Sequence, residues 1–407
     1  MTDSTTVRIL HTSDWQLGMT RWFLEGEAQA RFTEDRIQAV GTLLQIAEDK
    51  QCDAVVVAGD VFDDNLLAPS VFSRTIQQLA NAKVPVFLLP GNHDPLDASS
   101  VYHRDNLLQL DAITVLDDSS VHEVPPRAGG LPVEIVGAPL TSKSADEDLV
   151  AKALRNLDPI TDARARVIVG HGAVSSFGGS DAFDVIDIPT ATQACRDRIA
   201  DYVALGDTHS TQALNSDETV WYSGSHEVTD FREQDGGGEN NSGNVLLVEI
   251  TVDADRPERQ ATVATTQIPV GTWTFQAVDA QVNSLDDVNA FLDDLRQLPN
   301  HSTTVIKYGL TGTLSIAAAA ALDEGIDELK PGFAALYPRH SRTDVQVIPD
   351  DEEFSEGLLG QGFVGQAARE LRDMAQSESS GGDAEQARIA QDALRLLLRL
   401  SHKASNS

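Results

Sequence analysis

The sequence predicts an α/β fold in which helices flank a mixed or parallel sheet. Between residues 7 and 89, short apolar runs alternate with segments of helical periodicity, and this β-α-β-α-β order is typical of such sheets. Several of the apolar runs end on Asp, Asn or His. In an open α/β sheet, ligands bind at the carboxyl ends of the strands. The chain has 407 residues, which predicts two or three domains.

The first elements follow from the spacing of apolar residues. Val7–Thr12 predicts a strand, and Gln29–Lys50 predicts a helix because apolar residues recur there at helical spacing. Ala54–Ala58 predicts the next strand, Pro69 begins a second helix, and Val84–Leu89 completes the unit. Further strands are predicted near Ile113–Leu116, Val133–Val136, Val167–Val169 and Tyr202–Leu205, and a further helix at Ala145–Asn156.

The later part of the chain changes in composition. Glu233–Asn244 is polar and glycine-rich, which predicts a mobile hairpin loop. Residues 271–349 read strand, helix, strand, helix, strand, as expected for a small α/β domain. Gln376–Gly382 has the composition of a flexible linker, and a helix is predicted from Asp383 to His402. We therefore expect domains at 1–268 and 269–350, followed by a tail at 351–407.

Side chains of the kinds that bind metals follow five of the predicted strands. Carboxylate, amide and imidazole groups together suit a hard-to-borderline divalent ion. Two such ions, about 3.5–4 Å apart, can bind the attacking and leaving oxygens of a phosphoryl displacement. Asp60 is the candidate for a carboxylate shared by the two ions. The predicted metal ligands are Asp14, Gln16, Asp60, Asn92, His171, Asp207 and His209.

The order of these motifs resembles that of the calcineurin-like metallophosphoesterases. The chain reads Asp-Trp-Gln at 14–16, GDVFD at 59–63, GNHD at 91–94, GHG at 170–172 and GDTH at 206–209. HTSDWQLG near the start and YSGSHEVTDF at 222–231 narrow the resemblance to the SbcD-type DNA repair exonucleases, the nuclease subunits of bacterial SbcCD complexes. The resemblance implies a two-sheet sandwich flanked by helices over 1–268, a capping domain over 269–350, and a C-terminal helix that binds an SbcC-like coiled-coil ABC ATPase.

The resemblance also implies a role for each residue of the site. One metal ion would be held by Asp14, residue 16, Asp60 and His209, and the other by Asp60, Asn92, His171 and residue 207. His93 would protonate the leaving oxygen and Asp94 would orient His93. The implied activity is that of a metal-dependent DNA exonuclease, and endonuclease activity is left open.

Two positions depart from the family pattern. The first motif usually reads Asp-x-His and the last Gly-His-x-His, whereas this chain has Gln16 and Asp207. At each metal, an oxygen ligand would replace the imidazole that the family has. This replacement favours Mn²⁺ or Mg²⁺ over zinc or nickel. The alternative is a weakened site in a subunit that organises the complex. Another phosphate ester as substrate, cleaved by a phosphatase or a cyclic-nucleotide phosphodiesterase, is a further alternative.

Composition bears on partners and compartment. The net charge of −33 repels DNA at long range. Three explanations of this acidity are open: the acidic residues keep the surface solvated, metal ions and basic patches offset the charge locally, or a partner subunit provides the affinity for DNA. The sequence contains no apolar run of about 18 residues, so it predicts no membrane span. The first residues lack the pattern of a signal peptide. Cys52 and Cys195 are the two cysteines, so we expect a cytoplasmic protein with reduced thiols and no membrane partner. A homodimer is left open.

The predicted C-terminal helix has a basic stripe at Arg388, Arg395 and Arg399 beside a wide leucine-rich face. A wide apolar face predicts burial against another surface. That surface is either the body of the same chain or the ATPase partner. A contact of His226 with substrate phosphate is likewise left open.

Overall fold

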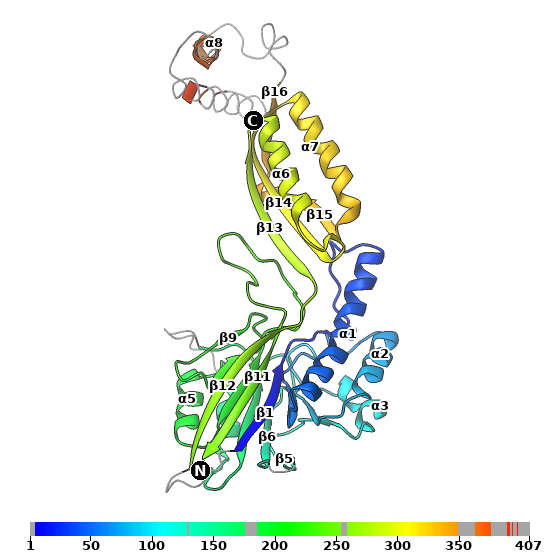
Figure 1. The fold of residues 1–407 in the computed structure, drawn as a ribbon, viewed down its shortest axis with the longest axis vertical. Helices are drawn as coiled ribbons and strands as arrows, with labels where there is room; N and C mark the ends of the chain where they lie inside the picture. Colours follow the sequence, from blue (N-terminus) through cyan, green and yellow to red (C-terminus); the bar gives the residue numbers. More distant parts are fainter. Residues whose placement is uncertain are drawn as a thin grey trace. The chain divides into compact units, whose positions relative to one another are not determined.

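The structure is a computed structural model that describes residues 5–127, 130–175, 185–253, 259–348 and 363–375, together with residues 389, 390, 393 and 397. The chain divides into two compact units, Met1–Phe275 and Gln276–Ser407 (Figure 1). Within the described residues, no helix combines the length and the apolar character that crossing a membrane requires.

The first unit contains two six-stranded sheets. The first sheet has the order β12-β11-β1-β2-β3-β4, and the second has the order β5-β6-β7-β8-β10-β9. The strands of the first sheet are β1 (Thr5–Thr12), β2 (Ala54–Val57), β3 (Val86–Leu88), β4 (Ile113–Val115), β11 (Asn244–Asp253) and β12 (Gln260–Pro269). Those of the second sheet are β5 (Val121–Val124), β6 (Val133–Ala138), β7 (Ala165–His171), β8 (Tyr202–Gly206), β9 (Gln212–Ala213) and β10 (Val220–Tyr222).

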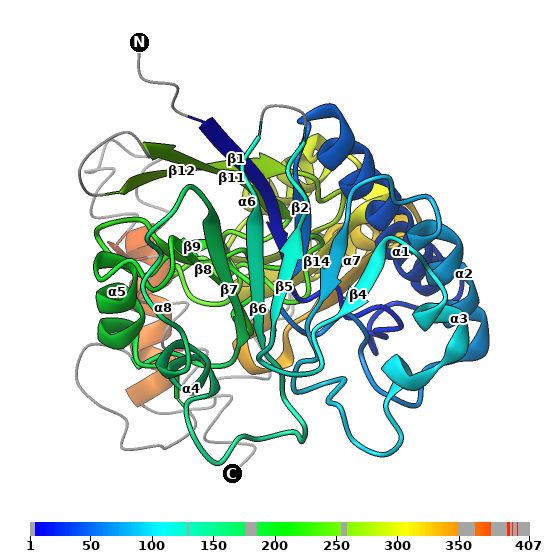
Figure 2. The same cartoon turned by 90° about the horizontal axis from the view of Figure 1, so that it is seen from below.

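Helices cover the outer faces of both sheets. They are α1 (Glu27–Asp49), α2 (Pro69–Leu79), α3 (Asp105–Leu108), α4 (Leu149–Arg155) and α5 (Ile188–Arg196), with a 3-10 turn at Val101–His103. Apolar residues of α1 and α2 pack on the first sheet, those of α4 and α5 pack on the second, and a third cluster joins the two sheets. In Figure 2, α1 and α2 lie on one side of the strands and α4 and α5 on the other. The predicted two-sheet sandwich flanked by helices is confirmed.

Strand β2 shows why the sequence forms this sandwich. Its four residues are all buried, because Val55 and Val57 face α1 and α2 while Ala54 and Val56 face the second sheet. Side chains alternate between the two faces of a strand. A strand covered on both faces therefore reads as a continuous apolar run.

Local capping corrects one predicted boundary. The helix expected at Ala145–Asn156 begins at Leu149 because Asp148 is its N-cap, and the Asp148 carboxylate accepts a hydrogen bond from the Ala151 N–H at 2.8 Å. The residues between β6 and Asp148 therefore form a loop.

The second unit follows the predicted order of strand, helix, strand, helix, strand. Its elements are β13 (Thr274–Val282, which begins in the first unit), α6 (Leu285–Gln297), β14 (Thr304–Ser315), α7 (Ile316–Leu329), β15 (Ala335–Pro338) and β16 (Asp344–Ile348), with 3-10 turns at His301–Thr303, Lys330–Gly332 and His340–Arg342. The short strand β15, which ends in proline and pairs in parallel with β14, was not predicted.

Helix α8 (Phe363–Ala375) follows in the tail. It was not predicted as a separate element. The linker expected at Gln376–Gly382 lies outside the described residues. So does the helix expected at Asp383–His402, apart from four single positions.

Candidate metal centre

The two sheets bring the ends of five strands together. β1, β2 and β3 run parallel, so the loops that follow them carry Asp14, Asp60 and Asn92 to one edge of the first sheet. β7 and β8 also run parallel, and they carry His171 and Asp207 to an edge of the second sheet. The Asp207 N–H donates to both oxygens of the Asp14 carboxylate at 3.2 Å. This contact joins the two edges.

The backbone is strained at this junction. Asp14, Gln16, Asp60 and Asp207 have φ values of 52°, 42°, 52° and 110°. For residues other than glycine, such conformations cost on the order of 1–3 kcal/mol each and cluster at functional sites. Four of the seven predicted ligands therefore adopt a backbone geometry that their own side chains disfavour.

Two glycines allow the loops to approach closely. A Cβ on Gly59, which has φ of 89°, would lie 2.1 Å from the His171 ring. A Cβ on Gly91 would lie 2.1 Å from an oxygen of Asp60. The glycines of the GDVFD and GNHD motifs thus leave the space in which the predicted ligands meet.

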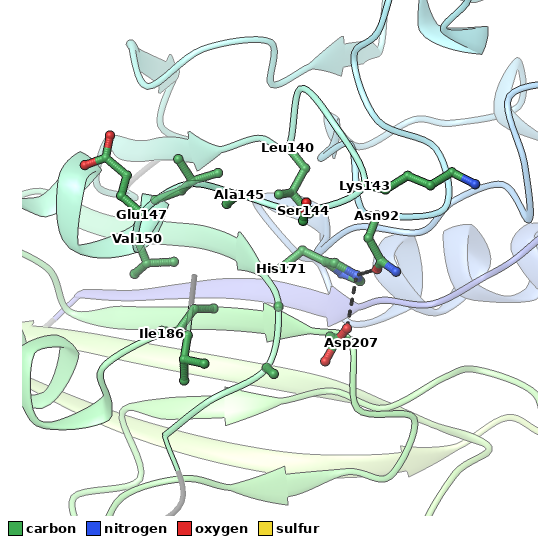
Figure 3. A pocket seen from close by; sticks show the side chains of 14 residues that line it. Asn92, Leu140, Lys143, Ser144, Ala145, Glu147, Val150, His171, Ile186 and Asp207 are labelled. Atoms are coloured by element: carbon green, nitrogen blue, oxygen red, sulfur yellow. Dashed lines mark hydrogen bonds and ion pairs between the residues drawn. The ribbon is translucent and has the colours of Figure 1, made fainter. Parts of the chain in front are cut away.

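The imidazole of His171 faces three oxygen atoms. Its Nδ1 lies 2.8 Å from the Ala58 carbonyl and donates to it. Nε2 then lies 2.8 Å from Asn92 Oδ1 and 3.9 Å from Asp207 Oδ1 (Figure 3). It also lies 3.4 Å from Asp60 Oδ1. Burial lowers the pKa of His171, but the surrounding carboxylates, Asp60 foremost, outweigh burial and raise this pKa to about 10. A nitrogen lone pair enclosed by oxygens requires a cation, either a proton or a metal ion.

The ring of His209 is held by a segment that follows the last motif. Its Nδ1 contacts the Thr229 hydroxyl and lies 3.5 Å from a Glu239 oxygen, and Thr229 donates to Glu239 at 2.5 Å. Nε2 therefore faces inward, 3.3 Å from Gln16 Nε2 and 4.0 Å from Asp14 Oδ1. Histidines that bind metals commonly donate their other N–H to such a partner.

Sequence reasoning missed Glu239. It is only 7% exposed, although it lies in the glycine-rich stretch that was expected to be a mobile loop. Its carboxylate accepts hydrogen bonds from the Thr229 and Asp230 N–H groups, each at 2.9 Å. Nothing in the local composition distinguishes this glutamate from its exposed neighbours.

Asp60 lies at the centre of the cluster. It is 2% exposed and accepts a hydrogen bond from the His93 N–H at 2.9 Å. Burial raises the pKa of Asp60, but the His171 charge and its hydrogen bond outweigh burial and lower it to about 2. One ligand atom from each of Asp14, Asp60 and His171 lies within 4.8 Å of the others. Asp60 thus has the position expected of a shared carboxylate.

The ring of His93 lies at the open side of this cluster. Its side chain is 40% exposed, with Nε2 4.0 Å from Asp60 Oδ2. Nδ1 lies 3.0 Å from the Asp63 carbonyl and donates to it.

The expectation that Asp94 orients His93 is not met. The buried Asp94 carboxylate accepts hydrogen bonds from the Phe62 and Gly91 N–H groups at 2.9 and 2.8 Å and from the Tyr102 hydroxyl at 2.6 Å. Burial, followed by the Asp60 charge, raises the pKa of Asp94 to about 7. Asp94 therefore fixes the loop that carries His93, while Asp63 contacts the ring itself.

A buried arginine forms hydrogen bonds to two backbone segments of the site. Arg36, on α1, is 1% exposed. It donates to the carbonyls of Trp15 at 2.7 Å, Val228 at 3.2 Å, Glu227 at 3.3 Å and Asp14 at 3.4 Å. Burial lowers the pKa of Arg36 to about 10. One side chain thus ties the first metal-binding loop to the segment that leads to Thr229.

Sequence reasoning missed Arg36, although a signal was available. The residue lies four positions after Phe32 and four before Val40, so it falls within the apolar face of α1, which is buried. Cations on such a face are rarely left without partners.

His226 does not reach the surface. It is fully buried, stacks edge-on against Trp15, and its Nε2 bonds the Arg36 carbonyl at 3.1 Å. The suggested contact of His226 with substrate phosphate is therefore wrong. Trp15 is likewise a core residue, 0% exposed.

The chemistry of the donor set fits divalent metal ions. The site offers carboxylate and amide oxygens with two imidazole nitrogens, a combination suited to hard-to-borderline ions. Gln16 Oε1 is buried and has no hydrogen-bond partner among the described residues. Buried acceptors are normally satisfied, so this oxygen is available to a cation.

Comparison with known proteins identifies the class. The chain belongs to the calcineurin-like phosphoesterase family, whose profile matches residues 7–211, about half of the sequence. Together with the Asp14–Asp60–His171 group, this family membership implies that the protein binds divalent metal.

Among the relatives is the D subunit of the nuclease SbcCD from Escherichia coli K12, which is 29% identical over 255 residues, covering 56% of this chain and 62% of that protein. The corresponding SbcCD protein from Bacillus subtilis 168 is 28% identical over 386 residues, covering 86% of this chain and 92% of its own. The chain thus spans less than two thirds of the length of the Escherichia coli relative. A dimetal phosphatase from Danio rerio aligns with 64% of this chain and 98% of its own at 10% identity, with a TM-score of 0.36, too low to support an inference.

Proposed function

We propose that the chain is a dinuclear-metal phosphodiesterase that cleaves DNA, chiefly as an exonuclease, within a double-strand break repair complex. The proposal rests on one observation above the others. Contacts of 4.0 Å or less connect all seven predicted ligands, which come from the ends of two sheets. The names of the relatives supply the substrate class.

The ligands divide into two sets that share Asp60. Asp14, Gln16, Asp60 and His209 would hold one ion, and Asp60, Asn92, His171 and Asp207 the other. When bound, such ions polarise the phosphoryl group and generate a nucleophile from water at neutral pH. Because Gln16 and Asp207 supply oxygen where the family has imidazole, we propose Mn²⁺ as the ion, with Mg²⁺ as the alternative.

His93 would supply the proton for the leaving oxygen. Its Nδ1–H is engaged by the Asp63 carbonyl, so Nε2 is the atom that holds the transferable proton. Nε2 faces Asp60, and the ring is partly exposed. The ring can therefore reach both the metal centre and a substrate arriving from solvent.

The partner in this proposal is an SbcC-like coiled-coil ABC ATPase in the cytoplasm, bound by the C-terminal part, residues 351–407. A net charge of −33 does not provide the basic surface that DNA binding usually requires. A partner subunit would supply much of the DNA affinity.

A second candidate function is a subunit with a weakened metal site. The Gln16 amide nitrogen, not its oxygen, faces His209 Nε2 at 3.3 Å. An N–H donated to this nitrogen occupies the lone pair that a metal would need. In this alternative the chain organises the complex without turning over substrate.

The test is a nuclease assay on end-labelled duplex DNA with Mn²⁺, with and without the ATPase partner. We expect cleavage by the parent and none by Asp60→Asn, which neutralises the shared carboxylate. Asp217→Asn is the matched control, because Asp217 is a surface residue paired with Arg196 and should retain full activity. Hydrolysis of small phosphate esters without cleavage of DNA would support another substrate. The absence of all hydrolysis would support the weakened site.

A further inference from the structure

A cavity of about 180 Å³ opens beside the metal centre. Asn92, His171 and Asp207, the side chains assigned above to the second ion alone, form one end of it (Figure 3). Away from these residues, the aliphatic side chains of Leu140, Ala145, Val150 and Ile186 form much of the wall, and Lys143, Ser144 and Glu147 also line it. Metal binding explains why Asn92, His171 and Asp207 lie at the polar end of the cavity. It does not explain why the cavity continues into a space with an aliphatic wall.

Hydrogen bonds fix the two walls of this cavity. The Leu140 N–H donates to the Pro90 carbonyl at 3.3 Å, and the Leu140 carbonyl accepts from Leu96 at 2.9 Å, so one wall is tied to the loop that carries Asn92. On the other wall, Ile186 exchanges backbone bonds with Ala173 and Ser175 at 2.9 and 3.1 Å. The cavity is therefore built into the same framework as the ligands.

One further bond joins the two walls. Asp148 caps α4 with one carboxylate oxygen. With the other it accepts a hydrogen bond from the Asp187 N–H at 2.9 Å. The loop before α4 and the segment around Ile186 are thereby held at a fixed separation.

The rim carries a cation. Lys143 lines the cavity together with Ser144, and within the described parts of the chain no carboxylate forms an ion pair with it. Glu147, the acidic residue of the same loop, is already paired with Lys152 at 2.7 Å and Arg155 at 3.3 Å. In a chain with 63 acidic and 30 basic side chains, an unpaired lysine beside the catalytic edge offers a contact for phosphate.

The shape and chemistry of the cavity match part of a nucleotide. A volume of about 180 Å³ is smaller than the roughly 300–1,000 Å³ of pockets that enclose whole drug-sized ligands. Aliphatic walls can cover the faces of a base without reading its hydrogen-bonding edge, so the pocket should accept any base.

We propose that this cavity binds the nucleoside next to the scissile phosphate, and that Lys143 binds the following phosphate of the same strand. The inference rests on the proposed phosphodiesterase function. It adds that the enzyme recognises a nucleoside and not the phosphate alone.

A binding experiment tests the pocket without requiring turnover. Calorimetry with Mn²⁺ present would compare thymidine 5′-monophosphate with inorganic phosphate. We expect the nucleotide to bind about tenfold more tightly, because the aliphatic wall removes part of the apolar surface of the base from water. Ala145→Trp, which fills the chamber, should abolish this preference. Ala80→Trp, at the exposed end of α2, should retain it. Equal affinities in the parent, or an unchanged preference in Ala145→Trp, would overturn the proposal.

Hydrolysis separates this inference from the proposed function. The substrates would be the 3′- and 5′-p-nitrophenyl phosphate esters of thymidine, with methyl p-nitrophenyl phosphate as the ester without a nucleoside. Ala145→Trp should raise KM for at least one thymidine ester about tenfold more than it raises KM for the methyl ester, because the methyl ester has no nucleoside to bury against the aliphatic wall. If the parent cleaves neither duplex DNA nor any of these esters, the proposed function fails. If it cleaves all three with one KM, the pocket fails and the function stands.

The proposed contact between Lys143 and the following phosphate is tested by dinucleotide binding. Lys143→Gln should weaken binding of the dinucleotide pdTpdT but not of thymidine monophosphate, and should reduce the salt dependence of dinucleotide binding by about one ion. Lys83→Gln, which removes an exposed lysine paired with Glu48, is the control. Equal dinucleotide affinity in Lys143→Gln and the parent would remove Lys143 from the assignment.

Discussion

Replacing Arg36 by methionine should destabilise the first unit and weaken its metal binding together. The guanidinium donates to four backbone carbonyls in two segments that are distant in sequence. The Glu227 carbonyl also accepts from the Ser225 hydroxyl at 2.7 Å, so it keeps a donor in the variant. The Trp15 and Val228 carbonyls would lose their cationic donor, and so would the Asp14 carbonyl, whose bond is the longest of the four at 3.4 Å.

The magnitude follows from the Trp15 and Val228 carbonyls, because the 3.4 Å bond to Asp14 is the weakest of the four. A buried polar group left unsatisfied costs about 1–3 kcal/mol, which gives on the order of 2–6 kcal/mol for the pair. Methionine avoids the cost of burying a charge, so we expect the lower part of that range, about 2–4 kcal/mol. Arg36→Lys should fall between methionine and the parent, because a single ammonium cannot span both segments as the planar guanidinium does.

Urea unfolding measures the free energy, and titration with Mn²⁺ followed by electron paramagnetic resonance measures the metal affinity. The loop held by Arg36 carries Asp14 and Gln16, so the first ion should bind more weakly while the second is less affected. Arg74→Met is the control, because Arg74 forms an exposed pair with Glu34 of a kind worth about 0–1 kcal/mol. A loss below about 1 kcal/mol in Arg36→Met, with unchanged Mn²⁺ affinity, would refute this reasoning.

Three further predictions concern the site and the tail. His93→Ala should reduce turnover by about 10²–10⁴ while elemental analysis finds the parental metal content, and loss of metal would instead make His93 a ligand. Gln16→His and Asp207→His should each keep or raise metal affinity and shift preference towards softer ions, which competition between Mn²⁺ and Zn²⁺ would measure; weaker binding of both metals would show that the oxygen donors are required. A chain lacking residues 376–407 should keep basal phosphodiesterase activity and lose co-purification with the ATPase and stimulation by ATP, and early melting of the shortened chain would show that the tail packs on its own body.

The sequence was informative where burial and polarity alternate sharply. The run that ends at Val57 is apolar on both faces, so the acidic residue that follows had to leave the sheet at its edge, where Asp60 is found. The same reasoning placed Asn92 and His171. These positions were predictable because ligands of open α/β sheets bind outside the carboxyl ends of the strands.

The residues that support the site were harder to find. Glu239 lies in a polar loop, and its burial depends on contacts with Thr229 that are set by the tertiary fold. Asp94 and Asp63 both follow strands, and only the packed loops show that Asp63 contacts the His93 ring. Arg36 could have been found from its place on the apolar face of α1, but its partners are backbone carbonyls, which have no signature in the side-chain sequence.

The number of metal ions bound per chain tests the central claim most directly. Elemental analysis and calorimetry of the protein with excess Mn²⁺ should find two ions per chain in the parent, and fewer in Asp60→Asn, which removes a charge from the carboxylate shared by both. Asp217→Asn should again bind two. A parent protein that binds one ion or none under these conditions would contradict the dinuclear centre and favour the weakened site.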